Sequence, residues 1–187
     1  MQLEETFDLP FSRERVWAAF KDIPMLVSCL PGASLQGDPA ADPLQLTFTV
    51  KLGPVSARFA GEGRVAYHEN CTGTLTGGGT DRATNSRVKG SAAFALEPTG
   101  SGTRVRLVID YALSGMLAQV GRPGIVKEIA AGLTRQFAAN LQSRIAEVDA
   151  PGSAVEGDAG GGSPAAASTP PLNAGALLGS ALAQRLN

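Results

Sequence analysis

The chain carries few side chains of the types that perform catalysis or bind metals. His68 is the only histidine, and Cys29 and Cys71 are the only cysteines. With this one histidine we expect no His-based metal site and no catalytic triad, and the two cysteines lack the spacing of zinc ligands. Gly77-Gly78-Gly79 lacks the Lys-Ser/Thr ending of a phosphate-binding loop, so we interpret it as a turn. We therefore expect no catalytic residue, no metal and no covalently bound cofactor.

Hydrogen-bonding groups for a small ligand are also scarce. Tyr67, Tyr111 and Ser28 could each donate a hydrogen bond to a polar headgroup. For either tyrosine taken alone, a backbone carbonyl is the more common partner of a buried hydroxyl. We expect Cys29 to be a small core residue, reduced like Cys71, and His68 to lie on the outer side of its strand.

Period-two alternation of apolar residues predicts a series of β-strands. The expected strands cover residues 3–9, 44–52, 55–67, a stretch around 75, 88–96 and 105–113, with one further short strand near 33–37. Two short helices are expected after the first strand, at 16–20 behind Ser12 as an N-cap and at 22–30. Strands grouped between helices are typical of an α+β fold rather than of alternating βαβ units.

A long amphipathic helix is predicted over residues 121–148. Its apolar residues recur every three or four positions and share one face: Val126, Ile129, Leu133, Phe137, Leu141, Ile145 and Val148. The expected solvent side holds Lys127, Glu128, Arg135, Gln136, Asn140, Gln142 and Glu147. This stripe must be buried against the sheet, and a sheet that curves around the helix would leave space for an apolar molecule.

Small residues occupy several positions of the strand faces that would meet this helix, namely Gly61, Gly63, Gly90 and Ala92. Glycine in a strand commonly marks a bulge or a bend of the sheet. Alternatively, small residues leave room for a ligand beneath the helix. The two interpretations are compatible, because a strongly curved sheet would itself create the cavity.

Composition divides the chain of 187 residues into a folded domain at 1–149, a linker at 150–171 and a tail at 172–187. The linker consists almost entirely of Gly, Ala, Ser, Pro and Thr, which is typical of a flexible tether. Net charge of −1 argues against nucleic-acid binding. The N-terminus does not resemble a signal peptide, and no apolar run is long enough to span a bilayer.

The tail has the pattern of a short amphipathic helix, with Leu177, Leu178, Leu182 and Leu186 as its apolar residues. A helix of this length is marginal in water and needs a surface on which to fold. Three interpretations remain: binding to a membrane interface, docking onto a partner enzyme, or a disordered end. The first two are favoured.

The element order, with two small helices after the first strand and a long terminal helix, resembles the START and birch-pollen-allergen superfamily. More narrowly, residues 1 to about 147 resemble the G-subunit family of carbon monoxide dehydrogenase. The resembling segments are Phe20-Lys21-Asp22-Ile23-Pro24, Leu30-Pro31-Gly32-Ala33, Val50-Lys51-Leu52-Gly53-Pro54-Val55, Phe59-Ala60-Gly61, Gly102-Thr103-Arg104-Val105 and the stretch from Leu117 to Leu141.

The resemblance implies a helix-grip fold, in which a curved antiparallel sheet of six to seven strands wraps the terminal helix around an apolar pocket. Expected pocket residues are Phe20, Leu26, Val27, Leu30, Phe48, Phe59, Phe94, Ile109, Tyr111, Leu117, Ile129, Leu133 and Phe137. Most of these also fit a simple core role, and only a subset should line the pocket.

The resemblance also implies a function. The expected ligand is lipophilic, menaquinone or another respiratory quinone, and the expected partner is a molybdenum hydroxylase of the carbon monoxide dehydrogenase type. The protein would support electron transfer to the membrane from the cytoplasm, held at the inner face of the cell membrane or at the enzyme by its tail. An assembly factor for the molybdenum enzyme is the alternative. A cyclase or hydrolase is a third interpretation, disfavoured because the expected pocket positions carry almost no acid/base groups.

Overall fold

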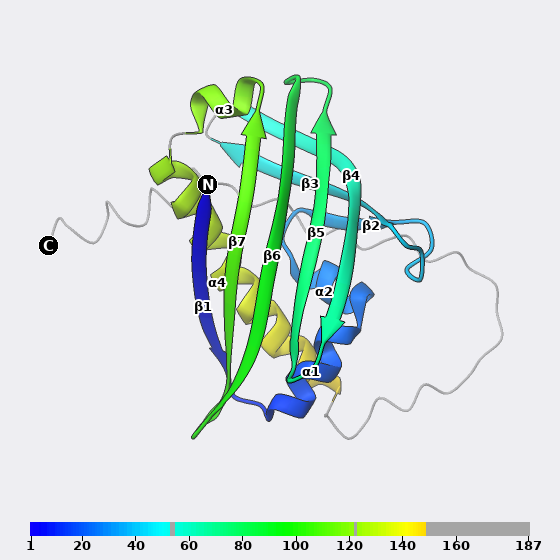
Figure 1. The fold of residues 1–187 in the computed structure, drawn as a ribbon, viewed down its shortest axis with the longest axis vertical. Helices are drawn as coiled ribbons and strands as arrows, with labels where there is room; N and C mark the ends of the chain where they lie inside the picture. Colours follow the sequence, from blue (N-terminus) through cyan, green and yellow to red (C-terminus); the bar gives the residue numbers. More distant parts are fainter. Residues whose placement is uncertain (53–54, 122, 149–187) are drawn as a thin grey trace, which may run out of the picture.

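Seven antiparallel strands form one sheet, which curves around a long C-terminal helix (Figure 1). The computed structural model describes residues 1–52, 55–121 and 123–148. The elements in chain order are β1 (Gln2–Leu9), α1 (Arg13–Lys21), α2 (Ile23–Cys29), β2 (Ala33–Gln36), β3 (Leu44–Leu52), β4 (Val55–His68), β5 (Thr72–Asp81), β6 (Ser86–Thr99), β7 (Gly102–Ser114), α3 (Met116–Val120) and α4 (Pro123–Val148).

The strand order is β1-β7-β6-β5-β4-β3-β2. The two edges of the sheet are therefore β1, which pairs with β7, and β2, which pairs with β3. Each neighbouring pair from β2 to β7 is consecutive in sequence, which short turns allow for antiparallel strands. The predicted α+β helix-grip class is confirmed, with seven strands, and the short strand expected near 33–37 is β2.

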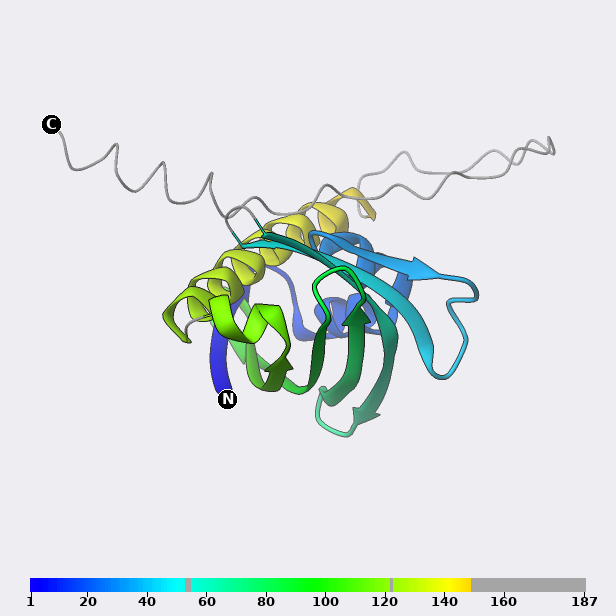
Figure 2. The same ribbon diagram turned by 90° about the horizontal axis from the view of Figure 1, so that it is seen from above.

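The helix α4 lies along the open side of the curved sheet (Figure 2). It packs against β1 and α2. The rings of Phe7 on β1 and Phe137 on α4 meet edge to face, with centroids 5.9 Å apart. Asn140 was expected on the solvent side, but its side-chain nitrogen donates to the carbonyl oxygen of Cys29 at 2.9 Å. It thereby satisfies a carbonyl in the last turn of α2, which no bond within that helix would satisfy.

The two short helices begin at different kinds of cap. Ser12 stands at the N-cap of α1 as predicted, but its side chain makes no capping hydrogen bond. Asp22 caps α2, because its carboxylate accepts a hydrogen bond from the Met25 amide at 2.9 Å. The predicted helix at 22–30 thus begins one residue later, and α1 is longer at its N-terminal end than the predicted 16–20.

The triple glycine at 77–79 lies inside β5, so its interpretation as a turn is wrong. Gly77 pairs with Gly63 on one side and with Gly90 on the other, so three glycines lie in register across three strands. A Cβ at Gly61 would collide with the carbonyl oxygen of Gly78, and one at Gly77 would lie 2.7 Å from the Glu62 carbonyl oxygen. These glycines let neighbouring backbones approach closely where the sheet bends, which supports the curvature interpretation.

Buried apolar residues form two separate cores. The first lies between α1, α2, the C-terminal half of α4 and the adjoining strand ends: Leu9, Val16, Ala19, Phe20, Cys29, Phe94, Leu96, Val105, Leu141 and Ile145. The second lies under α3 and is built on Ala57, Phe59 and Leu117. Val148, the last residue of the predicted stripe, is 70% exposed and belongs to neither core.

The short helix α3 is held against the β5–β6 turn by buried polar groups. Thr84 Oγ1 donates to a carboxylate oxygen of Asp81 at 2.6 Å, and Ser86 Oγ accepts from the Leu117 amide at 3.1 Å. Gly115, before α3, has φ of +83°, and a Cβ there would collide with the Asn85 carbonyl oxygen. Only glycine fits this link between β7 and α3 without strain. The hydrogen bond from Thr84 is the main cause of a lowered pKa of Asp81.

The predicted linker at 150–171 and tail at 172–187, including Leu177, Leu178, Leu182 and Leu186, lie outside the described residues. Among the helices that are described, none has the length and apolar content to cross a membrane.

Candidate ligand-binding face

The sheet face turned toward α4, called here the concave face, changes character along its length. Its ends are covered by the two cores, and its middle is not. We call the uncovered part the open band and define it by seven apolar side chains that belong to neither core. These are Leu3, Leu46, Leu75, Ile109 and Tyr111 on the strands and Ile129 and Leu133 on α4.

Leu75 is the most exposed member of the open band. It pairs across the sheet with Val65 and Ala92, and Val65 packs against the first core, so Leu75 points to the concave face. Yet 41% of its surface is exposed. A methyl group at Gly63 would lie 3.2 Å from Leu46 Cδ1 and 3.8 Å from Leu75 Cδ1, so both leucines lie over this glycine. An apolar wall is therefore in contact with solvent on the inner side of the sheet.

Two further exposed apolar residues lie at the α3 end of the molecule. Met116 on α3 is 47% exposed, and Ile125 in the first turn of α4 is 41% exposed. Single exposed apolar residues are common on protein surfaces, but these two lie on the elements that adjoin the open band at this end. A lipophilic molecule entering the open band from this end would meet an apolar rim.

The hydroxyl groups considered for headgroup binding differ in their partners. Tyr67 donates to the Phe20 carbonyl oxygen at 2.7 Å, and desolvation raises its pKa, so this hydroxyl keeps its proton in a structural bond. Ser28 Oγ donates to the Met25 carbonyl oxygen at 2.7 Å. Tyr111 Oη has only the Met1 sulfur, at 3.5 Å, as its acceptor among the described residues. Sulfur is a weak acceptor, so Tyr111 is the hydroxyl best able to turn to a ligand.

Neither cysteine has the features of a reactive site. Cys29 and Cys71 are free thiols, and Cys29 is buried in the first core, as expected. Desolvation by burial is the main cause of a raised pKa of Cys29, so the thiol stays protonated and unreactive near neutral pH. His68 is exposed and lies 3.3 Å from Thr74 Oγ1 on the outer face of the sheet.

Eleven of the thirteen predicted pocket residues lie in or against the cores or in the open band, and two lie in neither. Phe20 and Phe94 are buried in the first core, and Phe59 and Leu117 in the second. Leu26 and Phe137 pack against the first core and Phe48 against the second. Val27 and Leu30 are half-buried on and just after α2. Ile109, Tyr111, Ile129 and Leu133 lie in the open band.

The thirteen predicted pocket residues do not include Leu3, Leu46 or Leu75. Leu75 could have been found by its position, because it lies two residues before Gly77 and four before Gly79 on one face of a continuous strand. Because residues 77–79 were interpreted as a turn, the predicted strand around Leu75 was too short to show on which face of the sheet Leu75 lies. Leu3 and Leu46 follow the alternation of their strands, but alternation does not distinguish a covered position from an open one.

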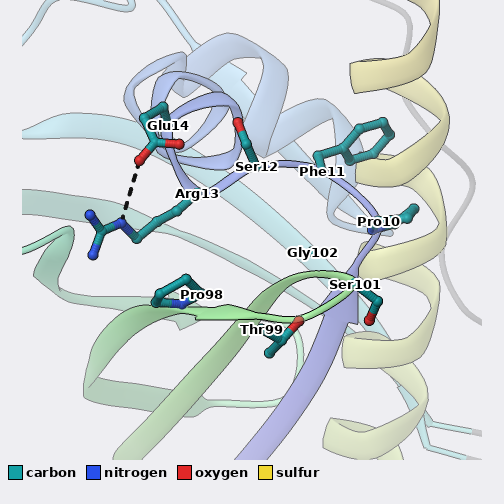
Figure 3. A pocket seen from close by; sticks show the side chains of 9 residues that line it. All are labelled: Pro10, Phe11, Ser12, Arg13, Glu14, Pro98, Thr99, Ser101 and Gly102. Atoms are coloured by element: carbon teal, nitrogen blue, oxygen red, sulfur yellow. Dashed lines mark ion pairs between the residues drawn. The ribbon is translucent and has the colours of Figure 1, made fainter.

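Two surface hollows lie elsewhere on the molecule. One, of about 410 Å³, is formed by the β1–α1 and β6–β7 connections at Pro10–Glu14 and Pro98–Gly102 (Figure 3). There Arg13 Nε is buried without a hydrogen bond and lies 3.7 Å from a Glu14 carboxylate oxygen. The other, of about 470 Å³, lies over β4, β5 and β6 at Gly77–Gly79. Neither is lined by members of the open band.

Acid/base and metal-binding groups are sparse on the concave face. Within the described residues, no three His, Cys, Asp or Glu side chains gather in a way that could hold a metal ion. The carboxylates on the concave side of the described strands are Glu5 and Asp81. Asp81 is engaged by Thr84 and by the Ala83 amide at 3.1 Å, which ties it to the turn.

The solved structures that resemble this chain confirm the fold. A conserved protein from Geobacillus kaustophilus aligns with a TM-score of 0.69 at 18% identity, covering 79% of this chain and 96% of its own. A protein from Thermus thermophilus gives 0.59 at 19% identity, covering 80% and 99%. A START superfamily protein from Mycobacterium smegmatis gives 0.53 at 17% identity, covering 79% and 98%. At these identities the likeness concerns the fold alone.

In sequence, no curated protein matches the chain. A family does match: the one described as the G subunit of carbon monoxide dehydrogenase (CoxG) fits residues 6–146. This range runs from the middle of β1 to the last turn of α4, and so includes both cores and every member of the open band except Leu3. By this match over most of its length, the chain belongs to the CoxG family, the G subunits of carbon monoxide dehydrogenase.

Proposed function

We propose that the protein binds a lipophilic molecule, a respiratory quinone such as menaquinone, in the open band between its two cores. The observation that supports this most is Leu75, an inward-facing leucine that is 41% exposed although it lies between two well-packed clusters. Leaving such a wall in water forfeits stability that closer packing of the sheet on α4 would provide. An isoprenoid chain laid across the open band would cover it.

The residues of the open band fit a quinone. Leu46, Leu75 and Ile109 on the sheet and Ile129 and Leu133 on α4 would hold the isoprenoid chain. Burying several hundred Å² of apolar surface contributes on the order of 10 kcal/mol gross at ~25 cal/mol/Å². Loss of translational and rotational freedom offsets much of that sum. The Tyr111 hydroxyl, now donating to a weak sulfur acceptor, would donate to a quinone carbonyl oxygen instead.

The proposed role follows from pairing this site with the family. A bound quinone would supply a two-electron acceptor, and this chain would bind it, shield its apolar chain from water and orient its headgroup. We propose that the electrons come from a carbon monoxide dehydrogenase-type molybdenum hydroxylase and pass to the membrane. The protein would act in the cytoplasm, at the inner face of the cell membrane. Its tail would mediate recruitment to the membrane or to the enzyme.

Lipid extraction tests the ligand directly. Protein purified from its own host under native conditions is expected to carry about one quinone per chain, identified by mass analysis of the extract and by native mass spectrometry of the complex. An extract that contains only phospholipid would contradict quinone binding. Protein that carries no lipophilic molecule but copurifies with an immature molybdenum enzyme would support the assembly-factor alternative instead.

Deletion of residues 151–187 tests the tail separately. The shortened chain keeps every described element, so its quinone content is expected to equal that of the full chain. Its association with membrane vesicles, measured by flotation, or with the partner enzyme, measured by pull-down, is expected to be lost. Equal association of the two chains in both assays would show that recruitment does not depend on the tail.

A further inference from the structure

We propose that the outer face of the sheet, opposite the open band, carries a docking site for an acidic segment of a partner protein. The site is the hollow of about 470 Å³ over Gly77–Gly79, called here the basic hollow. Its lining includes Glu62 and Arg64 on β4, Gly77–Gly79 on β5, and Arg87 and Lys89 on β6. The proposal does not depend on which molecule the concave face binds.

The floor of the basic hollow is backbone because glycines occupy the middle of β5. Gly78 faces outward between Glu62 on β4 and Lys89 on β6. A Cβ at Gly78 would lie 2.9 Å from the Val88 carbonyl oxygen and 3.2 Å from Lys89 Cγ. The methylene stem of Lys89 therefore lies close to Gly78.

The charges around the basic hollow are mainly positive and weakly neutralised. Arg64, Arg87 and Lys89 line it, against the single carboxylate of Glu62. Within the part of the chain that the structure describes, Arg87 and Lys89 form no ion pair. Arg64 pairs with Asp42 at 3.0 Å, but the two side chains are 61% and 78% exposed. Such an exposed pair contributes little and can exchange for another carboxylate.

A further cation enlarges the positive region. Arg58 is exposed and lies on the same outward face of β4, two residues before Ala60 of the hollow, and it too has no ion pair among the described residues. The whole chain has a net charge of −1, so this positive region is a local feature and not a general property of the surface. Local potentials of this kind attract and orient partners of opposite charge.

The spacing of the cations favours a protein segment over a small anion. Arg64 on β4 and Lys89 on β6 are separated by two strand spacings of about 4.8 Å and by two residues along the strands, so their backbones are roughly 12 Å apart. A single phosphate or carboxylate group cannot contact both without drawing the two side chains together. Carboxylates two to four residues apart in a peptide match this span. A flat lipid surface would touch the rim of the hollow and leave its floor empty.

The test is a titration of the full-length, isotopically labelled protein with a capped hexaglutamate peptide, followed by amide chemical shifts. Shifts are expected at Gly77–Gly79 and Lys89, with no change at Leu75 or Leu133. R87E/K89E is expected to weaken binding at least about tenfold, since it replaces two attractions by repulsions. Raising the salt concentration to about 0.5 M should also weaken binding of the unmodified protein.

The matched control is R106E/R135E, which changes net charge equally but alters exposed residues on β7 and α4, away from the hollow. It should bind hexaglutamate within about twofold of the unmodified protein. The neutral variant R87Q/K89Q serves if R87E/K89E does not fold, and a weakening of a few fold is expected. An equal effect of the control variant, equal binding of inorganic phosphate, or the same shifts on adding phosphatidylglycerol vesicles would each overturn the proposal.

Discussion

Leu75→Asp is expected to lower the affinity for menaquinone at least about tenfold, because the new carboxylate must lose its hydration when the ligand covers it. The same change should reduce the free energy of unfolding by only about 1–2 kcal/mol, less than a substitution in either core, since Leu75 is 41% exposed in the ligand-free protein. A large loss of binding with a small loss of stability is the behaviour of a ligand wall, not of a core residue.

Thr76→Asp is the matched control for this variant. Thr76 is the next residue of β5, is exposed, and faces the outer side, where its cross-strand neighbours are Arg64 and Ser91. The substitution Thr76→Asp therefore adds the same charge as Leu75→Asp, but on the face of the sheet opposite the open band. Binding can be followed by quenching of the single tryptophan, Trp17, by an added short-chain quinone. Equal affinities of the two variants would contradict a ligand site at Leu75.

The arrangement of strands and helices could be predicted because it depends on local periodicity. Alternation indicated the strands, and the three-to-four spacing located α4. The failures have local causes as well. Gly77–Gly79 suits a turn by composition, but here glycine is required at Gly77 and Gly78, where a Cβ would lie within 3.0 Å of a backbone carbonyl oxygen on a neighbouring strand. The helix α3 has five residues, too few to show a helical period, and it is fixed by Ser86 from another element.

The candidate site could be predicted only in outline. Alternation assigns Phe59, Phe94 and Leu75 to the same face, but only the arrangement of the helices decides which of them is covered. The first core covers Phe94 and the second, under α3, covers Phe59, whereas Leu75 belongs to neither. Asn140 shows that the sequence pattern can also wrongly predict exposure to solvent. Its polar side chain indicates solvent, but the end of α2 offers it a carbonyl partner.

The division of α4 into a core half and a ligand half leads to the second large effect. Leu141 is fully buried in the first core, whereas Leu133, two turns earlier on the same stripe, is half-buried and outside both cores. Leu141→Ala is expected to lower the free energy of unfolding by about 2–5 kcal/mol, because it removes packed atoms and leaves a cavity. Leu133→Ala should cost about 1 kcal/mol or less, since part of that side chain is already in water.

Urea denaturation of the two variants, with and without quinone, separates the two roles. A ligand that binds only the folded state adds RT ln(1 + [L]/Kd) to stability. If Leu133 belongs to the ligand wall, Leu133→Ala should raise Kd and reduce this added stability, although the ligand-free protein is nearly unaffected. Leu141→Ala should lower the free energy of unfolding of the ligand-free protein but leave the stabilisation added by the ligand unchanged. Similar losses in the ligand-free state, or an unchanged ligand effect in Leu133→Ala, would show that α4 has no such division.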